Sequence, residues 1–502
     1  MRERGYSLRF MPNLIGLVAS FKKPETLVLI AAFIILGFFS IFRLSEAPGI
    51  WYDEGYYTQL AMNVAQHGQQ RLQITPTESV SAATQTGGFT LIFPVAAAYK
   101  LFGIGVVQGR SVMVLYLFAL LAATYWLVRL LFGPATAAWS ALLMSTFAML
   151  YGDGKPVLGE VPGLFFLLLT LIAIFYLERS GYRHLRAYAA TGLAAGLCVV
   201  TKPIFLLLLP ALFFTLLIRW HRIHLRWSGF VLALVIFLLP VALWIGLQFG
   251  AGDSLASMLS FYANPYQVGD VGNLALQNLA RFFTEITPLY TFVLLLVWAV
   301  SMYVRRRAGR PASTTELSAF MFCMMIIAAY LRLPGWYRYI FPAAAVSLIF
   351  LPVASVVVFE YLRKRFSGLE RIAFAPYVFF ALMSAGQLYQ VAFSSYVADY
   401  YDGHRTRDLS ATLAMLAPEK SILLYNVPEV AVLLHTQNYY QYLKPHETDD
   451  GELLGRNNLA LLRAGTFDYV IINSSVYQLR LSDFSKYALL GTANRYSVLK
   501  NP

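Results

Sequence analysis

The sequence predicts a polytopic α-helical membrane protein with a small α/β domain at its C-terminal end. Three observations lead to this fold class. The chain has 502 residues, of which 58% are hydrophobic and only 13% are charged, and its mean hydropathy is +0.59. Apolar runs long enough to cross the hydrocarbon core of a bilayer recur through the first four fifths of the chain, separated by short polar loops. After residue 394 the composition changes to that of a small soluble domain.

The apolar runs predict about eleven transmembrane helices. These begin near Thr26, Ser111, Pro134, Val161, Ala187, Pro203, Gly229, Leu289, Glu316, Tyr339 and Ile372. One further apolar stretch, residues 89–102, contains Pro94 and Lys100 and is shorter than the roughly 20 residues that a helix needs to cross. We therefore expect this stretch to form an interfacial helix that lies along the outer surface.

Charge predicts the orientation of the helices. The net charge is +13, but the basic residues gather in alternate loops, at residues 179–186, 219–226, 305–310 and 363–371. This is the positive-inside pattern, so the charge indicates topology and not a nucleic-acid partner. We expect a multi-pass protein of a bacterial inner membrane, with its N-terminus in the cytoplasm. No small-residue cleavage site follows the first span, so that span is expected to be a start-transfer helix rather than a signal peptide.

Two domains are expected, a transmembrane catalytic domain of residues 1–393 and an extracytoplasmic α/β domain of residues 394–502. In the first domain, residues 43–88 form the first outer loop, and residues 250–288 form an outer loop long enough to gate a substrate. In the second domain no glycine-rich phosphate loop is visible, which favours a lid or an acceptor platform over a second catalytic centre. Strands are expected at residues 421–425, 469–472 and 496–499, and a short helix at residues 429–435.

Two adjacent carboxylates, Asp53 and Glu54, follow the first span, and Tyr56 and Tyr57 come directly after them. Carboxylates are common general bases, and aromatic rings suit sugar faces, so the tyrosines are candidate acceptor or sugar contacts. The alternative is a pair of acids in the first turn of a helix, with the tyrosines in an aromatic belt.

A second outer loop carries Glu160, with Asp153 and Lys155 before it as further candidate contacts. Taken alone, Glu160 is also explained as an N-terminal cap of the next span. If the two outer loops converge, one acid could act as a base and the other could orient the acceptor. Asp53 and Glu160 could also hold a divalent cation, the one cofactor that the sequence leaves open.

Three cations are expected on the same face. Lys202 interrupts two apolar runs, and Arg332 and Arg338 flank the start of another span. Cations at such a depth need a partner, and a lipid phosphate is a natural one; the alternative is snorkelling to the interface. Arg110 is expected on the inner side, in a structural role.

These residues resemble the GT-C superfamily of polyprenyl-phosphate-sugar glycosyltransferases, in the branch that holds the protein O-mannosyltransferases and the lipid A aminoarabinose transferase. The resemblance covers most of the chain and depends on the order and sidedness of short motifs. These are the acidic pair after the first span, Tyr99-Lys100-Leu101-Phe102-Gly103, Gly159-Glu160-Val161-Pro162, Thr201-Lys202-Pro203 and Arg338-Tyr339-Ile340-Phe341-Pro342.

The resemblance implies an inverting glycosyltransferase that moves a sugar from a polyprenyl-phosphate donor to lipid A or the lipopolysaccharide core, another envelope glycan or a protein. It implies catalytic roles for Asp53, with Glu54 beside it, and for Glu160, and donor-phosphate binding by Lys202, Arg332 and Arg338. The chain departs from the aminoarabinose transferases at residues 85–88. They have Glu-Lys-Pro-Pro there, with the lysine as a phosphate ligand, whereas this chain has Gln-Thr-Gly-Gly.

Two alternative functions are weighed against this one. A transporter or flippase would place ionisable residues near the bilayer midplane and would show an internal repeat, and the sequence has neither feature. A lipid-linked saccharide polymerase or ligase usually relies on arginines in a large outer loop, and residues 250–288 carry only Arg281.

Overall fold

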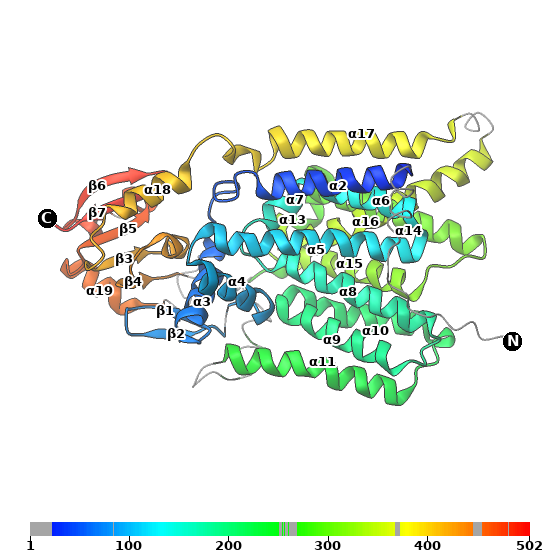
Figure 1. The fold of residues 1–502 in the computed structure, drawn as a ribbon, viewed down its shortest axis with the longest axis horizontal. Helices are drawn as coiled ribbons and strands as arrows, with labels where there is room; N and C mark the ends of the chain where they lie inside the picture. Colours follow the sequence, from blue (N-terminus) through cyan, green and yellow to red (C-terminus); the bar gives the residue numbers. More distant parts are fainter. Residues whose placement is uncertain are drawn as a thin grey trace.

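All eleven predicted spans correspond to helices of one bundle (Figure 1). The computed structural model describes residues 23–83, 85–249, 254, 256, 260, 269–366, 372–444, 454–479 and 481–502. Within this part of the chain, eight helical segments are long and apolar enough to cross a membrane: α2 (Pro24–Ile41), α5 (Val106–Phe132), α8 (Glu160–Arg179), the segment Pro203–Arg222 containing α10 (Leu208–Arg219), α11 (Trp227–Gln248), α14 (Ile286–Arg307), α15 (Thr314–Arg332) and α16 (Tyr337–Arg365). The other three predicted spans are the shorter helices α6 (Pro134–Ser145), α9 (Leu185–Thr201) and α17 (Ala375–Tyr389).

Helices α16 and α11 mark the centre and the edge of the bundle. In α16, 78% of the most apolar stretch is buried, whereas in α11 only 6% is buried. An apolar helix that exposes its side chains to this extent is suited to contact with lipid. Helix α11 packs on α9 through Gly192, where a Cβ atom would lie 2.2 Å from the carbonyl oxygen of Ala233. The missing side chain therefore allows the two backbones to approach closely.

Four short elements join the bundle to the C-terminal domain: α3 (Tyr52–His67), β1 (Arg71–Gln73), β2 (Ser79–Ser81) and α4 (Phe89–Phe102). Strands β1 and β2 form a small antiparallel hairpin. Helix α4 has the bounds predicted for the interfacial helix, and it packs on α3 and α5 at the bundle end that faces the C-terminal sheet (Figure 1). The same end therefore receives the first predicted outer loop.

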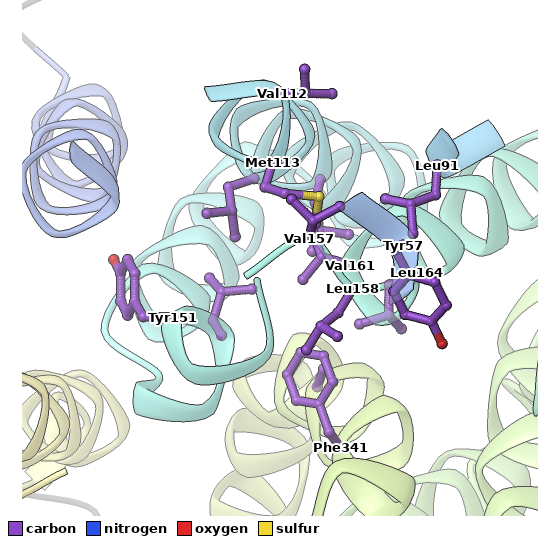
Figure 2. Packing of buried hydrophobic residues seen from close by; sticks show 14 of the residues in the cluster. Tyr57, Leu91, Val112, Met113, Tyr151, Val157, Leu158, Val161, Leu164 and Phe341 are labelled. Atoms are coloured by element: carbon purple, nitrogen blue, oxygen red, sulfur yellow. The ribbon is translucent and has the colours of Figure 1, made fainter. Parts of the chain in front are cut away.

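The loop before α8 is buried in the bundle. It follows α7 (Ala148–Gly154) and leads to Glu160, the first residue of α8. Figure 2 shows Val157, Leu158 and Val161 surrounded by apolar side chains, among them Met113 of α5 and Phe341 of α16. Because these side chains are fully buried, the path of the loop is determined by packing, which fixes the position of Glu160.

The C-terminal domain contains a five-stranded mixed sheet in the order β4-β3-β5-β7-β6. Its strands are β3 (Ile422–Tyr425), β4 (Tyr439–Tyr442), β5 (Tyr469–Asn473), β6 (Ala488–Ala493) and β7 (Tyr496–Lys500). Strand β3 pairs in parallel with β4 and β5, and β7 pairs antiparallel with β5 and β6. The three predicted strands are β3, β5 and β7, and the predicted short helix is the 3₁₀ helix η6 (Pro428–Leu433). Strands β4 and β6 were not predicted.

The remaining elements are α13 (Val271–Thr284), α18 (Arg405–Ala414), α19 (Arg456–Ala464), α20 (Ser474–Leu479), the π-helical turn η4 (Gln390–Ser394) and the 3₁₀ segments η1 (Pro203–Leu207), η2 (Trp220–Arg222), η5 (Ala398–Tyr400) and η7 (Leu481–Phe484). Helix α13 occupies the second half of the predicted large outer loop. Most of residues 250–268, the first half of that loop, and the N-terminal residues 1–22, which include the predicted cytoplasmic N-terminus, lie outside the described residues.

Helix α3 is held against the C-terminal domain by close packing and buried amide contacts. At Gly55 a Cβ atom would lie 2.2 Å from the backbone nitrogen of Glu429 in η6, so only glycine permits this approach. The Gln59 amide of α3 donates to the Pro428 carbonyl at 2.8 Å and exchanges hydrogen bonds with the Gln441 amide of β4. Each polar group is buried and satisfied, which fixes α3 relative to the sheet.

Candidate active site

Asp53 lies in the first turn of α3, and its Oδ2 atom forms an ion pair with Nη1 of Arg338 at the start of α16. The guanidinium of Arg338 also lies over the rings of Trp336 and Tyr339, at 4.8 and 5.1 Å from the ring centroids. The Asp53 side chain is 26% exposed, whereas that of Arg338 is 11% exposed. The pair thus joins two of the predicted site residues, 285 positions apart, and leaves the carboxylate partly accessible.

Glu54 points elsewhere and is fully engaged inside the protein. Its two oxygens accept from Nε and Nη2 of Arg110, at 2.8 and 2.7 Å, and also from the backbone nitrogens of Val157 and Trp51. Arg110 donates in addition to the carbonyl oxygens of Leu44, Pro48 and Gly49.

This arrangement corrects two expectations. Glu54, expected beside Asp53 in catalysis, ties the first loop to α5, because neither of its oxygens is available to a substrate. Arg110 was expected on the inner side, and that expectation was wrong. It lies at the same end of the bundle as Glu54, because α4 stays at that end and α5 begins there. Its expected structural role agrees with these contacts.

Glu160 and Lys202 form the second ion pair of the site. Nζ of Lys202, the residue that follows α9, donates to Oε1 of Glu160 at the start of α8. Both side chains are nearly buried, at 7% and 2% exposure. The other carboxylate oxygen, Oε2, is buried and has no hydrogen-bond partner within the described residues. A buried charged oxygen without a partner is costly in a finished site, and it marks a position where a ligand group or water can donate.

Asp153 of α7 links the two ion pairs electrostatically. Burial raises the pKa of Asp153 to about 8, and the Glu160 carboxylate adds to that rise, whereas Arg338 and Lys202 act against it. Asp153 therefore lies close enough to interact with Glu160, Lys202 and Arg338, which belong to the two ion pairs. We call Asp53, Arg338, Glu160, Lys202 and Asp153 the outer charge cluster.

Of the two tyrosines predicted as sugar contacts, Tyr57 is the one at the cluster. It is buried, its hydroxyl bonds the Thr86 hydroxyl, and burial together with Asp53 and Glu160 raises its pKa. The Tyr56 hydroxyl instead bonds that of Tyr52 at 3.0 Å, close to the C-terminal domain. Both rings are covered by protein, so a direct contact of either with sugar requires the surrounding side chains to move.

Two other predicted site residues make no hydrogen bond or ion pair with the cluster in the described part of the chain. Lys155 is fully buried, and its Nζ donates to the Phe42 carbonyl at 2.7 Å. Burial and the Arg110 charge lower the pKa of Lys155 to about 7. Arg332 ends α15, and its exposed side chain makes no hydrogen bond or ion pair with the described residues.

Residues 85–88, where the expected lysine ligand of the aminoarabinose transferases is missing, cover the end of α9. A Cβ atom at Gly88 would lie 1.7 Å from the carbonyl oxygen of Val200, and the Gly88 nitrogen donates to Thr201. Gly88 therefore allows the loop to lie directly against the turn that carries Lys202, and Gly87 makes room for the Tyr57 ring. The Gln248 amide of α11 holds the same loop by donating to the Gln85 carbonyl at 2.5 Å.

The fit of a divalent cation can be judged from the carboxylates themselves. Asp53 and Glu160 are already paired with Arg338 and Lys202, and the raised pKa of Asp153 favours its neutral form. Across the described ranges, no three His, Cys, Asp or Glu side chains come together as metal ligands. This donor set does not fit a divalent cation held by Asp53 and Glu160.

Comparison with known proteins gives one family and several solved structures. A sequence model of the dolichyl-phosphate-mannose-protein mannosyltransferases matches residues 90–245. Crystal structures of ArnT from Cupriavidus metallidurans, in the apo state and bound to undecaprenyl phosphate, match with TM-scores of 0.63 and 0.61 at 15% and 16% identity, over 97% and 95% of this chain and 98% of theirs. The chain therefore shares the fold of these ArnT structures over nearly its whole length.

An archaeal structure shares this fold as well. The oligosaccharyltransferase AglB from Archaeoglobus fulgidus, in complex with an inhibitory peptide and a dolichol-phosphate, matches with a TM-score of 0.55 at 12% identity, over 93% of this chain and 71% of that chain. No curated protein sequence matches. The family match and the shared fold support the expected enzyme class, a membrane glycosyltransferase.

Proposed function

We propose that this protein is an inverting glycosyltransferase that moves a sugar from a polyprenyl-phosphate donor to an acceptor hydroxyl at the outer face of a bacterial inner membrane. The observation that carries the proposal is the outer charge cluster, in which two cations and three carboxylates from four helices and the turn after α9 meet at one end of the bundle. A departing phosphate needs cations, and an attacking hydroxyl needs a base.

Lys202 and Arg338 are proposed to hold the donor phosphate. Both are nearly buried, so their attraction to a phosphate is screened less than it would be in water. They are now paired with Glu160 and Asp53, and the donor phosphate would share or replace these carboxylate partners. Arg332 is proposed as an additional phosphate contact, because its guanidinium is exposed and without a polar partner in the described part of the chain.

Asp53 is proposed as the base because its side chain is 26% exposed, whereas that of Glu160 is 2% exposed. An acceptor that arrives from outside can reach Asp53 first. When the phosphate draws Arg338 away, Asp53 takes the proton of the acceptor hydroxyl. The hydroxyl oxygen then forms a bond to the anomeric carbon on the face opposite the phosphate, and the carbon–oxygen bond to the phosphate breaks, which inverts the configuration.

Glu160 and Asp153 are proposed to set the charge around the donor. Glu160 orients Lys202 and offers its second oxygen to the sugar or to water. Because the pKa of Asp153 is about 8, this side chain is largely neutral at pH 7 and can donate a hydrogen bond. A neutral acid adds no negative charge beside the phosphate.

Related proteins bind ligands of the proposed kind. ArnT from Cupriavidus metallidurans is bound to undecaprenyl phosphate, and AglB from Archaeoglobus fulgidus is in complex with a dolichol-phosphate and a peptide. These ligands support a polyprenyl-phosphate donor. The acceptor classes that remain proposed are lipid A or the lipopolysaccharide core, another envelope glycan, and protein.

The test is Asp53→Asn, compared with Asp402→Asn at an exposed aspartate of the C-terminal domain. Each variant is expressed in a deletion strain, and envelope glycolipids and glycoproteins are compared by mass spectrometry. We expect wild type and Asp402→Asn to restore the modification that the deletion removes, and Asp53→Asn to lower it at least about 100-fold, the effect of losing a general base. Full restoration by Asp53→Asn, at equal protein level in the membrane, would refute the assignment of Asp53.

A further inference from the structure

A cavity separate from the outer charge cluster lies between the first loop and the C-terminal domain. Its volume is about 190 Å³, and its walls come from three distant parts of the chain. The first loop contributes Gly49 and Ile50, η5 and the start of α18 contribute Tyr400, Arg405, Thr406 and Leu409, and the turn into β7 contributes Asn494, Arg495 and Tyr496. Arg405 and Asn494 are exposed, so the cavity opens to solvent on their side.

The cavity wall is built by specific contacts. A Cβ atom at Gly49 would lie 2.4 Å from the Tyr400 ring, so glycine makes room for that ring against the loop. Arg495 donates to the Ile50 carbonyl at 3.1 Å and pairs with Glu429 at 2.8 Å, and the Tyr496 hydroxyl donates to the same carboxylate. These contacts join the loop, η6 and β7 around the cavity.

In the described part of the chain, the residues that line the cavity include two arginines and no carboxylate, and one of the arginines is not paired with an acid. Glu429 is neutralised by Arg495, and the Glu46 carboxylate accepts from the backbone nitrogens of Thr406 and Arg407 at the start of α18. The guanidinium of Arg405 lies 4.7 Å from the centre of the Tyr400 ring and, within the described residues, has no carboxylate partner. A cation that is held in place by an aromatic ring but not neutralised is suited to bind an anion.

The other wall residues suit a sugar ring. Tyr400 and Tyr496 line the cavity with Arg405 and Arg495 over their rings, and Asn494 and Thr406 provide polar groups that can bond hydroxyls. The volume exceeds the roughly 150 Å³ of a cavity known to hold benzene, so one ring can enter while its substituents extend through the open side. A longer acidic peptide would need an extended groove, which this cavity does not provide.

We propose that this cavity binds one anionic sugar unit, bearing a phosphate or a carboxylate, of the acceptor glycan. The proposal rests on the proposed function, because it assigns the acceptor of that reaction to acidic glycans. Ile50 lines the cavity only three residues before Asp53, so their Cα atoms are at most about 11 Å apart. An acidic unit bound here would place a neighbouring sugar of the same acceptor near the base.

The test is direct binding to the full-length protein in lipid nanodiscs, by saturation-transfer difference NMR. The probes are glucose 1-phosphate, glucuronic acid, glucose, inorganic phosphate and a tetra-aspartate peptide. We expect glucose 1-phosphate or glucuronic acid to bind at least tenfold more tightly than glucose or phosphate, and the two sugar acids distinguish a phosphate from a carboxylate ligand. Arg405→Gln should weaken that binding about tenfold, and Arg407→Gln, which removes the same charge from the same helix outside the cavity, should not.

Three results would overturn the proposal: equal binding of glucose and the acidic sugars, binding of phosphate or the peptide as tight as that of the acidic sugars, or equal losses in the two arginine variants. Donor turnover is not part of this measurement. A failed binding test therefore leaves the Asp53→Asn result standing, and a failed Asp53→Asn test leaves the binding result standing.

Discussion

At the scale of single residues, the neighbours Asp53 and Glu54 have opposite environments. Successive residues of an α-helix point about 100° apart, so adjacent side chains on α3 must face different partners. Asp53 faces Arg338 and remains partly exposed, whereas Glu54 is enclosed by Arg110 and two backbone nitrogens. One carboxylate is accessible to a substrate, and the other fixes the loop that presents it.

The titration of Asp153 gives a prediction about stability. Its pKa is about 8 in the folded protein and 3.8 as a free side chain, because burial and Glu160 favour the neutral form. The folded state therefore holds this proton more tightly, and the contribution of Asp153 to stability is lost as pH rises from about 4 to about 8. The side chain of Asp153→Asn cannot ionise, so this variant does not lose that contribution. Its thermal midpoint should rise relative to that of wild type between pH 4 and pH 8, and the difference should stay constant above pH 8.

The measurement is thermal unfolding of both proteins in detergent at steps of pH. A difference between variant and wild type that stays constant from pH 4 to pH 8 would contradict the shifted pKa. If the midpoint of the variant instead rises relative to that of wild type as pH falls, burial of the Asp153 charge is not the main effect.

At the scale of elements, the C-terminal domain positions α3. The contact depends on Gly55, where a Cβ atom would meet backbone atoms of Glu429 that no side-chain rotation can move. Gly55→Ala should therefore destabilise the protein by roughly 1–3 kcal/mol, the usual effect of overpacking. We expect a lower thermal midpoint and faster proteolytic release of the C-terminal domain.

The matched control for this variant is Gly246→Ala in α11, where a Cβ atom would have nothing within 4 Å. Alanine is the better helix former, so this change should leave the thermal midpoint unchanged or raise it. If both alanine variants behave alike, the close contact between α3 and η6 does not hold the domain in place.

Elements were predictable where one local signal determined them. Long apolar runs predicted the helices of the bundle, and the buried runs at residues 421–425 and 469–472 predicted β3 and β5. Strand β4 was missed because Gln441, although fully buried, is polar: its amide is satisfied by Gln59 and Gln73, which lie far away in the sequence. Such a contact forms only in the folded chain, so no local sequence pattern predicts it.

The same difference applies to the candidate site. Asp53, Glu160, Lys202 and Arg338 could be named from the sequence because each is a charge at the edge of an apolar run. How they pair, and the pairing of Glu54 with Arg110, follow from the packing of helices that are distant in the sequence. Arg405 and Arg495 belong to the C-terminal domain, where charged residues are ordinary, and only the cavity between them gives them significance.

At the scale of the whole molecule, basic runs and the outer charge cluster lie at opposite ends of the bundle. Helix α8 begins with Glu160 and ends with Arg179, and α14 and α16 end with the basic runs Arg305–Arg307 and Arg363–Arg365. The outer charge cluster and the C-terminal sheet lie at the opposite end (Figure 1). If the positive-inside rule holds, the cluster faces outward and the donor sugar must be presented on the outer side of the membrane.

This orientation can be tested by labelling single cysteines. The two native cysteines, Cys198 and Cys323, are fully buried, so they should contribute little background. A membrane-impermeant maleimide added to intact spheroplasts should label Glu419→Cys, at an exposed position of the C-terminal domain, and should label Arg310→Cys only after the membrane is opened. The reverse pattern would place the charge cluster in the cytoplasm, where the acceptor would have to be a cytoplasmic molecule, and the outer-face reaction would be excluded even if Asp53 proved essential.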